Sequence, residues 1–588
     1  MHIAKIEIMN FRNFKTLTVA GLGPAAVIIG ANNVGKSNLL HALRLVLDPL
    51  MSDAERMLRA EDFWDGLNAP FLGQEIRVVV ELHGFEDDDA GKAALASCMV
   101  EGEPLTGRLT YVYRPLETVE ATEAGPGEYD FLVFGGTNER RRVAHDVRRY
   151  VSVRVLPALR DVVRDLQAWS RSPLRQLVER ARKKISRESF ETLSQTLLGA
   201  TETFLEEPAI DDLDDVIAER VRELASGAFR FDTELGIAAA GPEEVLRALR
   251  LSISGPKSRP VGDISLGRAN IVYLALLLEN LHQAQVGGEL AATVLAVEEP
   301  EAHLHPHIQR VLFRYLLRQR WPVLVTTHSP HIASVSPLGS MVLLRDCGDE
   351  GSQAFRAEGA GLSKQQVRDI QRYLDVTRAE MLFAKGVVLV EGAAELYIIP
   401  AIAKQLGHDL DAFGVTVCAV HGTDFAPYRK LLGSDAFAVA NVVMTDGDKG
   451  AGLRRGARLA DAEGFEGLGD GIRELVEDGK SRQARNALKK IGIFVGQMEL
   501  EIDLLPAAAD EMKRTYSQLH TGRTASERFG IAVDAVVSGN QEAAKTVLKH
   551  INRVGKGRFA QRLAPKLKDI SPPEYIVSAI ESVMKLVQ

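Results

Sequence analysis

The chain has 588 residues, of which 46% are hydrophobic and 26% charged, and its formal net charge is −8 at pH 7. This length predicts several globular domains, and the charge excludes a uniformly basic nucleic-acid binder while leaving room for local basic strips. The N-terminus shows no signal-like segment and the apolar runs are too short to span a bilayer, so we expect a cytoplasmic protein without a membrane partner. The three cysteines are far apart in the sequence, which argues against a disulfide framework or a zinc site.

The first predicted elements are two strands joined by a short turn between Lys5 and Val19. The turn contains Asn10-Phe-Arg-Asn13, which resembles the opening of the RecF and structural-maintenance-of-chromosomes (SMC) ATPases. In those ATPases the Asn-Phe-Arg segment lies over the bound nucleotide. The resemblance implies that Arg12 contacts a phosphate, and an exposed turn arginine is the alternative.

A phosphate-binding loop follows, because Gly30 to Ser37 fits the pattern G-x-x-x-x-G-K-[ST] between a predicted buried strand and a predicted helix. The glycines allow backbone N–H groups to surround phosphates, and the helix N-terminus adds its positive end. Lys36 would reach the β- and γ-phosphates, and the Ser37 hydroxyl would bind Mg²⁺. The sequence therefore predicts an ATP site whose loop contributes Asn33, Gly35, Lys36, Ser37 and Asn38.

Two β-rich runs at 75–82 and 108–113 predict the antiparallel lobe of such an ATPase head. From about Arg154 to Leu224, apolar residues such as Leu159 and Val163 recur at helical spacing. This insertion is far too short for the coiled-coil arm of an SMC protein. We expect either a compact helical hairpin that pairs two copies of the chain or a helical cover on the same core.

The head resumes at 263–270, followed by a predicted helix at 271–281. Ser265-Leu-Gly267 resembles a degenerate signature loop of ABC-type ATPases, although Arg268 replaces the usual second glycine. In that family a serine at a helix N-terminus contacts the γ-phosphate held by the opposite subunit. The resemblance implies that Ser265 binds nucleotide and that the chain forms a homodimer or a higher homo-oligomer.

An apolar strand beginning at Thr293 ends in two acidic residues, Glu298 and Glu299. This pair is typical of the hydrolytic half of a P-loop site, in which Glu298 would hold Mg²⁺ and Glu299 would orient and deprotonate the attacking water. The next apolar strand ends at His328, where the resemblance implies a switch histidine that contacts the γ-phosphate. Three histidines, His303, His305 and His307, could form a metal site. Their spacing around Pro306 favours the start of a helix instead.

A second α/β pattern begins at Lys385 and predicts three strands with acidic residues at their ends. Strand-Glu-Gly, then strand-Gly, then strand-Asp-x-Asp resembles a Toprim domain. Carboxylates at the C-terminal ends of neighbouring parallel strands share one crevice and suit Mg²⁺ or Mn²⁺. The sequence therefore predicts a two-cation site for in-line phosphodiester cleavage, with Glu391, Glu395, Asp446 and Asp448 as metal ligands.

The ATPase head followed directly by a Toprim pattern resembles the overcoming-lysogenisation-defect (OLD) family of nucleases, over nearly the whole chain. The segment 499–504 resembles the family's late acidic segment, so that Glu501 would complete the metal site and Glu499 would approach it. Lys556-Gly-Arg-Phe resembles the family's C-terminal lysine motif. By this resemblance Lys556 would stabilise charge on the scissile phosphate, and a helix-start lysine is the alternative.

We therefore expect an α/β protein in which a RecF/SMC-like ABC ATPase head with a helical insertion precedes a Toprim α/β domain with a helical C-terminal part. The expected function is an ATP-hydrolysing DNA endonuclease that uses divalent metal, with ATP and Mg²⁺ (or Mn²⁺ or Ca²⁺ at the Toprim site) as cofactors. No tyrosine near Glu391 or Asp448 in the sequence stands out as an obvious nucleophile, which favours cleavage by activated water. The expected boundaries are 1–155 and 236–378 for the head, 156–235 for the insertion and 379–588 for the nuclease domain.

DNA would be bound largely without sequence preference by basic strips at 480–490 and 549–568. The family resemblance further implies a role in defence against phage, and a helicase or other defence protein as a partner. Two alternatives stay open: a non-nucleolytic RecF/SMC-like DNA-binding ATPase in repair, and another Toprim enzyme such as a primase or topoisomerase.

Overall fold

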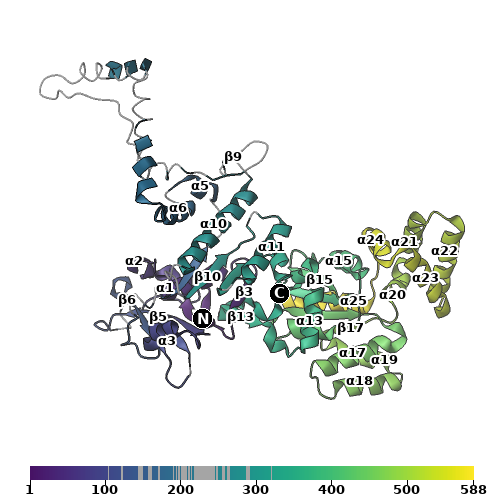
Figure 1. Cartoon of the computed structure of the whole chain (residues 1–588). Helices are drawn as coiled ribbons and strands as arrows, with labels where there is room; N and C mark the ends of the chain where they lie inside the picture. The colour runs from purple at the N-terminus through teal and green to yellow at the C-terminus, as the bar shows by residue number, and fades with distance from the viewer. Residues whose placement is uncertain are drawn as a thin grey trace. The chain divides into compact units, whose positions relative to one another are not determined.

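The computed structural model describes residues 1–156 apart from 104, 121–123, 144–146, 148 and 149, a discontinuous set between 162 and 260, then 265–286, and 292–588 apart from 303 and 320. The chain divides into two compact units (Figure 1). The first comprises Met1–Pro157, Ala292–Glu301 and Pro306–Gln588, and the second comprises Ala158–Ala291 and Ala302–His305. Within the described residues, no helix is both long and apolar enough to cross a membrane.

The first sheet of the larger unit is antiparallel and has the strand order β2-β1-β4-β5-β6. The strands β1 (His2–Phe11) and β2 (Phe14–Val19) are the two predicted at the N-terminus, and they pair across the turn that holds Arg12. The predicted β-rich runs form β4 (Ile76–His83) and β5 (Gly107–Pro115), and β6 (Tyr129–Gly135) was not predicted. Alternate side chains of β1 and β2 enter one hydrophobic core.

A six-stranded sheet with the order β13-β12-β3-β11-β10-β7 carries the phosphate-binding loop. Its central strands β3 (Ala25–Ile29), β11 (Val323–Thr327) and β10 (Ala292–Glu298) are parallel, so their C-terminal ends meet at one edge. The helix α1 (Lys36–Leu47) follows β3 and buries its apolar face in the same core as the first sheet. The edge of this sheet is completed by β12 (Met341–Asp346) and β13 (Ser352–Arg356).

The start of the helical insertion was placed too early, because residues 154–156 belong to β7 (Val151–Leu156). This strand pairs in parallel with β10, where Leu295 faces Arg154. Residues 154–156 continue a strand whose earlier residues Val151 and Val153 are β-branched and fully buried, which favours strand over helix here. Tertiary pairing therefore decides the conformation of a segment whose apolar spacing also fits a helix.

The smaller unit is helical among its described residues. It contains α5 (Val162–Gln167), α6 (Leu174–Arg182) and α10 (Leu266–Val286), and Arg180 donates to the Asn280 backbone carbonyl at 2.9 Å. The short strands β8 (Ser252–Ile253) and β9 (Arg259–Pro260) pair in the same unit. The predicted hairpin or cover falls mostly outside the described residues, so its form stays a prediction.

A third sheet with the order β15-β14-β16-β17 forms the Toprim-like part, and all its strands are parallel. The strands β14 (Gly386–Val390), β15 (Val415–Ala419) and β16 (Ala440–Thr445) are the three predicted ones, and β17 (Ile493–Val495) is an addition. Every residue of β14 is buried, as expected for a strand covered on both faces. The connecting helices are α15 (Glu395–Gln405), α16 (Ala426–Leu432), α17 (Ala451–Ala462), α18 (Leu468–Glu477) and α19 (Ser481–Lys489).

The C-terminal part is helical, as predicted, and it shares a hydrophobic core with the third sheet. Its helices are α20 (Leu500–Asp503), α21 (Leu505–Leu519), α22 (Arg523–Val537), α23 (Ala544–Val554), α24 (Lys556–Leu563) and α25 (Glu574–Val587). Buried residues such as Ile580 and Val583 of α25 belong to this shared core. The core therefore fixes α20 and α24, which begin beside Glu499 and at Lys556, relative to the sheet.

Candidate functional site

The phosphate-binding loop has the conformation that its glycines predict. Gly35 has a φ of 92°, which other residues rarely adopt, and a Cβ atom there would lie 2.8 Å from the Phe14 ring. A larger residue would therefore have both an unfavourable backbone conformation and a steric clash. Lys36 is buried, and its ammonium donates to the Gly30 and Ala31 carbonyls at 3.0 and 2.7 Å. Burial lowers the pKa of Lys36, and the nearby carboxylates oppose this shift. The loop therefore holds its lysine ammonium inside the ring of backbone groups that would receive phosphates.

The two halves of the predicted magnesium site come together across the sheet. The Ser37 hydroxyl donates to the Glu298 carboxylate, although 261 positions separate them in the sequence. Glu298 ends β10 and pairs with Thr326 on β11, which lies between β10 and β3. A hydroxyl and a carboxylate in contact at the start of a helix are the donors that Mg²⁺ takes in a P-loop site.

A third acidic residue, Glu301, was not predicted and organises the hydrolytic side of this site. Its buried carboxylate accepts from the Thr327 hydroxyl at 2.6 Å and from the His328 backbone N–H at 3.0 Å. Burial raises the pKa of Glu301. His328 Nδ1 lies 3.5 Å from both Glu299 and Glu301, so the predicted base and the predicted switch histidine are neighbours. The only sequence signal for Glu301 was its place in the acidic run after β10.

Arg12 lies beside the P-loop helix α1. Its guanidinium donates to Asn38 at 2.8 Å and to Asp62 at 2.8 Å. Asn38 also bonds to Asn13, and Asn13 donates to the Asn33 backbone carbonyl at 3.1 Å. The structure therefore brings Arg12, Asn33 and Asn38 into one polar network around the loop.

Ser265 lies in the smaller unit, immediately before α10. Its carbonyl accepts from the Arg268 and Ala269 N–H groups at 2.9 and 3.1 Å, so the serine begins the helix. The role of Ser265 in nucleotide binding stays a prediction. Pro306 begins α11 (Pro306–Leu317), which agrees with the helix-start interpretation of the histidines, and His303 lies outside the described residues.

The second site forms where β14 and β16 end. Glu391 accepts from the Thr445 hydroxyl and from the Asp446 backbone N–H, the latter at 3.0 Å. Asp446 in turn accepts from the Leu500 backbone N–H at 3.0 Å, which ties the late acidic segment to the strand end. Gly447 donates to the Met498 carbonyl at 2.8 Å, and a Cβ at this glycine would overlap the Gln497 backbone. The glycine of Asp-Gly-Asp therefore permits this close approach.

Glu395, Glu501 and Lys556 surround Asp446 from three helices. Glu395 and Glu501 are 6% and 4% exposed, and the Lys556 ammonium lies 3.2 Å from Glu501. Burial lowers the pKa of Lys556, but the charge and hydrogen bond of Glu501, with the other carboxylates, raise it above its ordinary value overall. Glu499 caps the start of α20 with its carbonyl, and its charge acts on Asp503.

The electrostatics of this cluster are those of carboxylates that need a cation. Burial, followed by the charges of Glu391, Glu395 and Glu501, raises the pKa of Asp446 to about 8. Burial, with Glu501 and Glu391, raises the pKa of Glu395 to about 6. One oxygen of Glu501 is buried without a hydrogen-bond partner among the described residues. Such a set of hard oxygen donors fits a divalent cation, which would relieve the repulsion.

Arg455 on α17 is the functional candidate that the sequence analysis missed. Its guanidinium donates to Asp448 at 2.7 Å, to Glu391 at 3.1 Å and to the Asp446 carbonyl at 2.8 Å. In the described part of the chain, no three His, Cys, Asp or Glu side chains are grouped closely enough to hold a metal. The guanidinium of Arg455 lies between two of the predicted ligands, Asp448 and Glu391.

Two family models match the chain, in the order that the two sites indicate. The AAA ATPase domain matches residues 1–101 and 174–333, and the TOPRIM domain of overcoming lysogenization defect protein-like proteins matches residues 382–448. The first covers the phosphate-binding loop, Glu298 and His328, and the second covers Glu391, Glu395, Asp446 and Asp448.

Known proteins give the same assignment. The chain is 24% identical to the OLD nuclease of Thermus scotoductus over 71% of this chain and 76% of that protein. It is also 24% identical to endonuclease GajA of Bacillus cereus, over 88% and 91% of the two chains. The solved C-terminal region of the Xanthomonas campestris OLD protein is 34% identical, over 35% of this chain and 96% of that one, with a TM-score of 0.30. The chain therefore belongs to the OLD family, with an ATPase head followed by an OLD-type Toprim domain.

Proposed function

We propose that this protein is an ATP-hydrolysing DNA endonuclease whose Toprim site uses divalent cations. The observation that carries the proposal is the convergence of buried carboxylates on Asp446, with a lysine ammonium bonded to one of them. Nuclease names among the relatives support the activity. An acidic cluster that burial makes unstable without a cation would have no purely structural advantage over apolar packing.

Glu391, Asp446 and Asp448 would hold the cations, with Glu395 and Glu501 completing the ligand set. Bound there, the cations would supply an activated water and would neutralise charge on the scissile phosphate. The residues of this chain have separate roles. Lys556, held at 3.2 Å from Glu501, places positive charge where the phosphate would develop negative charge. Thr445 and the Asp446 N–H fix the orientation of Glu391.

In the head, ATP would bind to the loop at Gly30–Ser37, with Mg²⁺ between Ser37 and Glu298. Glu299 would act as the base for the attacking water, and His328 would contact the γ-phosphate. Ser265 would complete the site of a second copy, so we propose a homodimer in which the insertion at 156–235 contributes to pairing. We propose that head closure regulates cleavage, that the protein acts in the cytoplasm against phage, and that a helicase or other defence protein assists it.

One assay tests the proposal. Supercoiled plasmid is incubated with the protein and Mg²⁺ or Mn²⁺, with and without ATP, and the nicked and linear forms are quantified. We expect cleavage that requires a divalent cation and that EDTA abolishes. Intact plasmid under every metal and nucleotide condition, with ATP hydrolysis present, would instead indicate a non-nucleolytic DNA-binding ATPase.

Tyr575, whose pKa is shifted by burial and by charges of this cluster, does not favour a covalent topoisomerase-type reaction. The Tyr575 hydroxyl is buried and has no hydrogen-bond partner in the described part of the chain. Burial, with the charges of Asp503 and Asp446, raises the pKa of Tyr575 well above its ordinary value. A phenol that resists ionisation is a poor nucleophile, so water is the better attacking group.

A further inference from the structure

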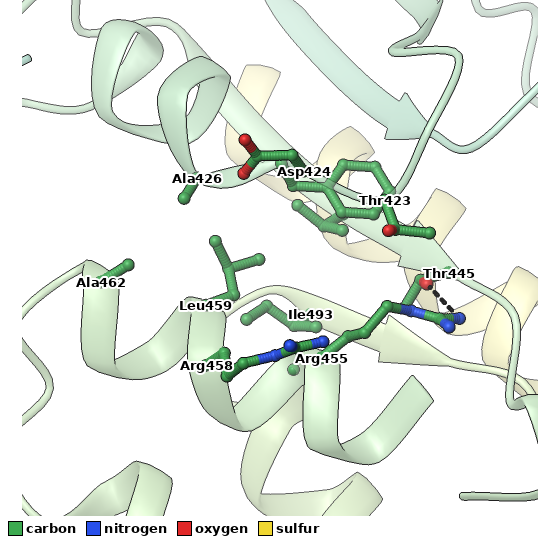
Figure 2. A pocket seen from close by; sticks show the side chains of 12 residues that line it. Thr423, Asp424, Ala426, Thr445, Arg455, Arg458, Leu459, Ala462 and Ile493 are labelled. Atoms are coloured by element: carbon green, nitrogen blue, oxygen red, sulfur yellow. Dashed lines mark hydrogen bonds between the residues drawn. The ribbon is translucent and has the colours of Figure 1, made fainter. Parts of the chain in front are cut away.

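A cavity of about 370 Å³ adjoins the end of β16, where Thr445 and Arg455 of α17 line it (Figure 2). One side is formed by the segment after β15, including Thr423 and Asp424, and the other by Arg455 and Arg458 of α17. Ile493 of β17 lies between the two sides. The cavity is large enough for one small organic ligand.

Two residues that line the cavity are bonded to the acidic cluster. Thr445 lines the cavity and donates its hydroxyl to Glu391. Arg455 lines the cavity and bonds to both Glu391 and Asp448. A molecule in the cavity would therefore contact side chains that are bonded directly to the proposed metal ligands.

The lining combines an apolar surface with three charged groups. Leu459 and Ile493 are buried, and they supply the apolar surface together with Ala462. Arg458 is exposed at the cavity and forms no hydrogen bond or ion pair with any described residue. Arg455 keeps its Nε buried and unpaired in the described part of the chain. The cavity therefore offers unused cationic donors next to an apolar wall.

This combination matches a nucleotide better than other small ligands. A purely apolar ligand would leave the charged groups desolvated and unpaired, which is costly. Inorganic phosphate would pair with the arginines but would leave the apolar wall uncovered. A nucleotide suits both the apolar wall and the arginines. Its base is a flat ring whose face can pack on the apolar wall, and its phosphate is an anion that arginine binds well.

We propose that this cavity binds one nucleotide of the DNA strand next to the scissile phosphate, with its base against Leu459 and its phosphate towards Arg455 and Arg458. This inference rests on the proposed nuclease function. To enter the cavity the base must leave the stack, so single-stranded, frayed or mismatched DNA would be bound more easily than a continuous duplex.

Asp424 gives the cavity a preference among bases. Its carboxylate lies away from the two arginines (Figure 2), and a carboxylate at this position accepts hydrogen bonds but cannot donate them. It therefore favours a base with an exocyclic amino group over one with a carbonyl at the same position. Deoxycytidine monophosphate (dCMP) and deoxyuridine monophosphate (dUMP) form a suitable pair of probes, because they differ only at this edge of the ring.

The test measures dCMP and dUMP binding by calorimetry in EDTA, with the full chain carrying Lys36→Ala so that the P-loop does not contribute. We expect dCMP to bind at least several-fold more tightly than dUMP, and Asp424→Asn to remove the difference. Arg458→Ala and the cavity-filling Ala462→Phe should each weaken dCMP binding at least fivefold. Arg454→Ala is the matched control, because Arg454 is exposed on the same helix and does not line the cavity.

Absence of dCMP binding, or equal loss in Arg454→Ala and Arg458→Ala, would overturn the site. The same variants with Lys36 restored are then compared in the plasmid assay, where Arg458→Ala should cleave more slowly than Arg454→Ala. Equal cleavage by these two, with dCMP binding lost only in Arg458→Ala, would overturn the use of the cavity by DNA. If the unmodified chain binds dCMP but cleaves no plasmid under any condition, the nuclease proposal fails and the nucleotide site stands.

Discussion

The guanidinium of Arg455 lies 2.7 Å from the Asp448 carboxylate and 3.1 Å from Glu391, so it joins two carboxylates that we assign to the metal. A divalent cation and this guanidinium would repel each other at such distances. We expect the guanidinium to move off these carboxylates when a cation binds, towards the cavity that Arg455 also lines. Its hydrogen bonds partly neutralise Asp448 and Glu391.

Replacing this guanidinium should strengthen metal binding. With Arg455→Gln, the cation no longer competes with a fixed positive charge, and we expect Mn²⁺ affinity to rise about fivefold, which corresponds to about 1 kcal/mol. Titration calorimetry with Mn²⁺ measures this, and Arg454→Gln is the control for loss of charge on the same helix. Weaker Mn²⁺ binding in Arg455→Gln would show that the arginine supports the ligands and does not compete with the cation.

Removing the central carboxylate should separate the two activities. Asp446→Asn keeps the size of the side chain but loses the carboxylate that would bind the cation beside Glu391, Glu395 and Glu501. We expect plasmid cleavage to fall by about 10³-fold or more, as expected when the group that holds a catalytic metal is lost, and ATP hydrolysis to continue. Asp510→Asn, at an exposed position, is the control. Nicking by Asp446→Asn at the unmodified rate would refute the site.

The converse change acts on the head. Lys36→Ala removes the ammonium that the loop holds at 2.7 Å from the Ala31 carbonyl, and with it the positive charge for the β- and γ-phosphates. We expect ATP binding, measured with a fluorescent ATP analogue, to weaken at least tenfold, or about 1.4 kcal/mol. Mn²⁺ binding at the Toprim site should be unchanged. Unaltered ATP binding would mean that the loop is not the nucleotide site.

Local patterns in the sequence predict the parts of the fold that they determine. Strands such as β3 and β14 are continuous apolar runs that end in polar motifs, so their positions and the residues at their ends could be identified. The end of β7, residues 154–156, was taken for the start of a helix, because its conformation depends on pairing with β10, more than 130 positions later in the chain. Long-range pairing of this kind leaves no local signal.

The same distinction applies to the sites. Acidic residues at strand ends could be predicted because ligand sites in open α/β sheets lie at the carboxyl ends of the strands and cations bind carboxylates. Glu301 and Arg455 were missed because they act through neighbours. Glu301 orients the segment at Thr327 and His328, and Arg455 reaches the cluster from the second turn of α17. The basic residues Arg485 and Lys489 were predicted to bind DNA. Arg485 also donates to the Gly496 carbonyl, and Lys489 donates to the Ser578 hydroxyl.

Glu301 should matter for hydrolysis more than for binding of ATP. Glu301→Gln retains the shape but weakens the bonds from Thr327 and His328, which hold the histidine beside Glu299. We expect kcat for ATP hydrolysis to fall about 10-fold to 100-fold, as for a residue that positions catalytic groups, with little change in KM. Steady-state kinetics give both values. A rise in KM alone would assign Glu301 to nucleotide binding.

The variant Tyr575→Phe tests whether this tyrosine attacks DNA covalently. Because its hydroxyl is buried without a partner among the described residues, Tyr575→Phe should change the free energy of unfolding by less than about 1 kcal/mol. Its raised pKa makes it a poor nucleophile, so we expect the variant to cleave plasmid at the unmodified rate. Urea denaturation measures the first quantity and the plasmid assay the second. Two results together would instead assign the protein to covalent strand transfer: a folded Tyr575→Phe protein that no longer cleaves, and a protein–DNA adduct trapped with the unmodified chain. Both are expected only if Tyr575 attacks the phosphate.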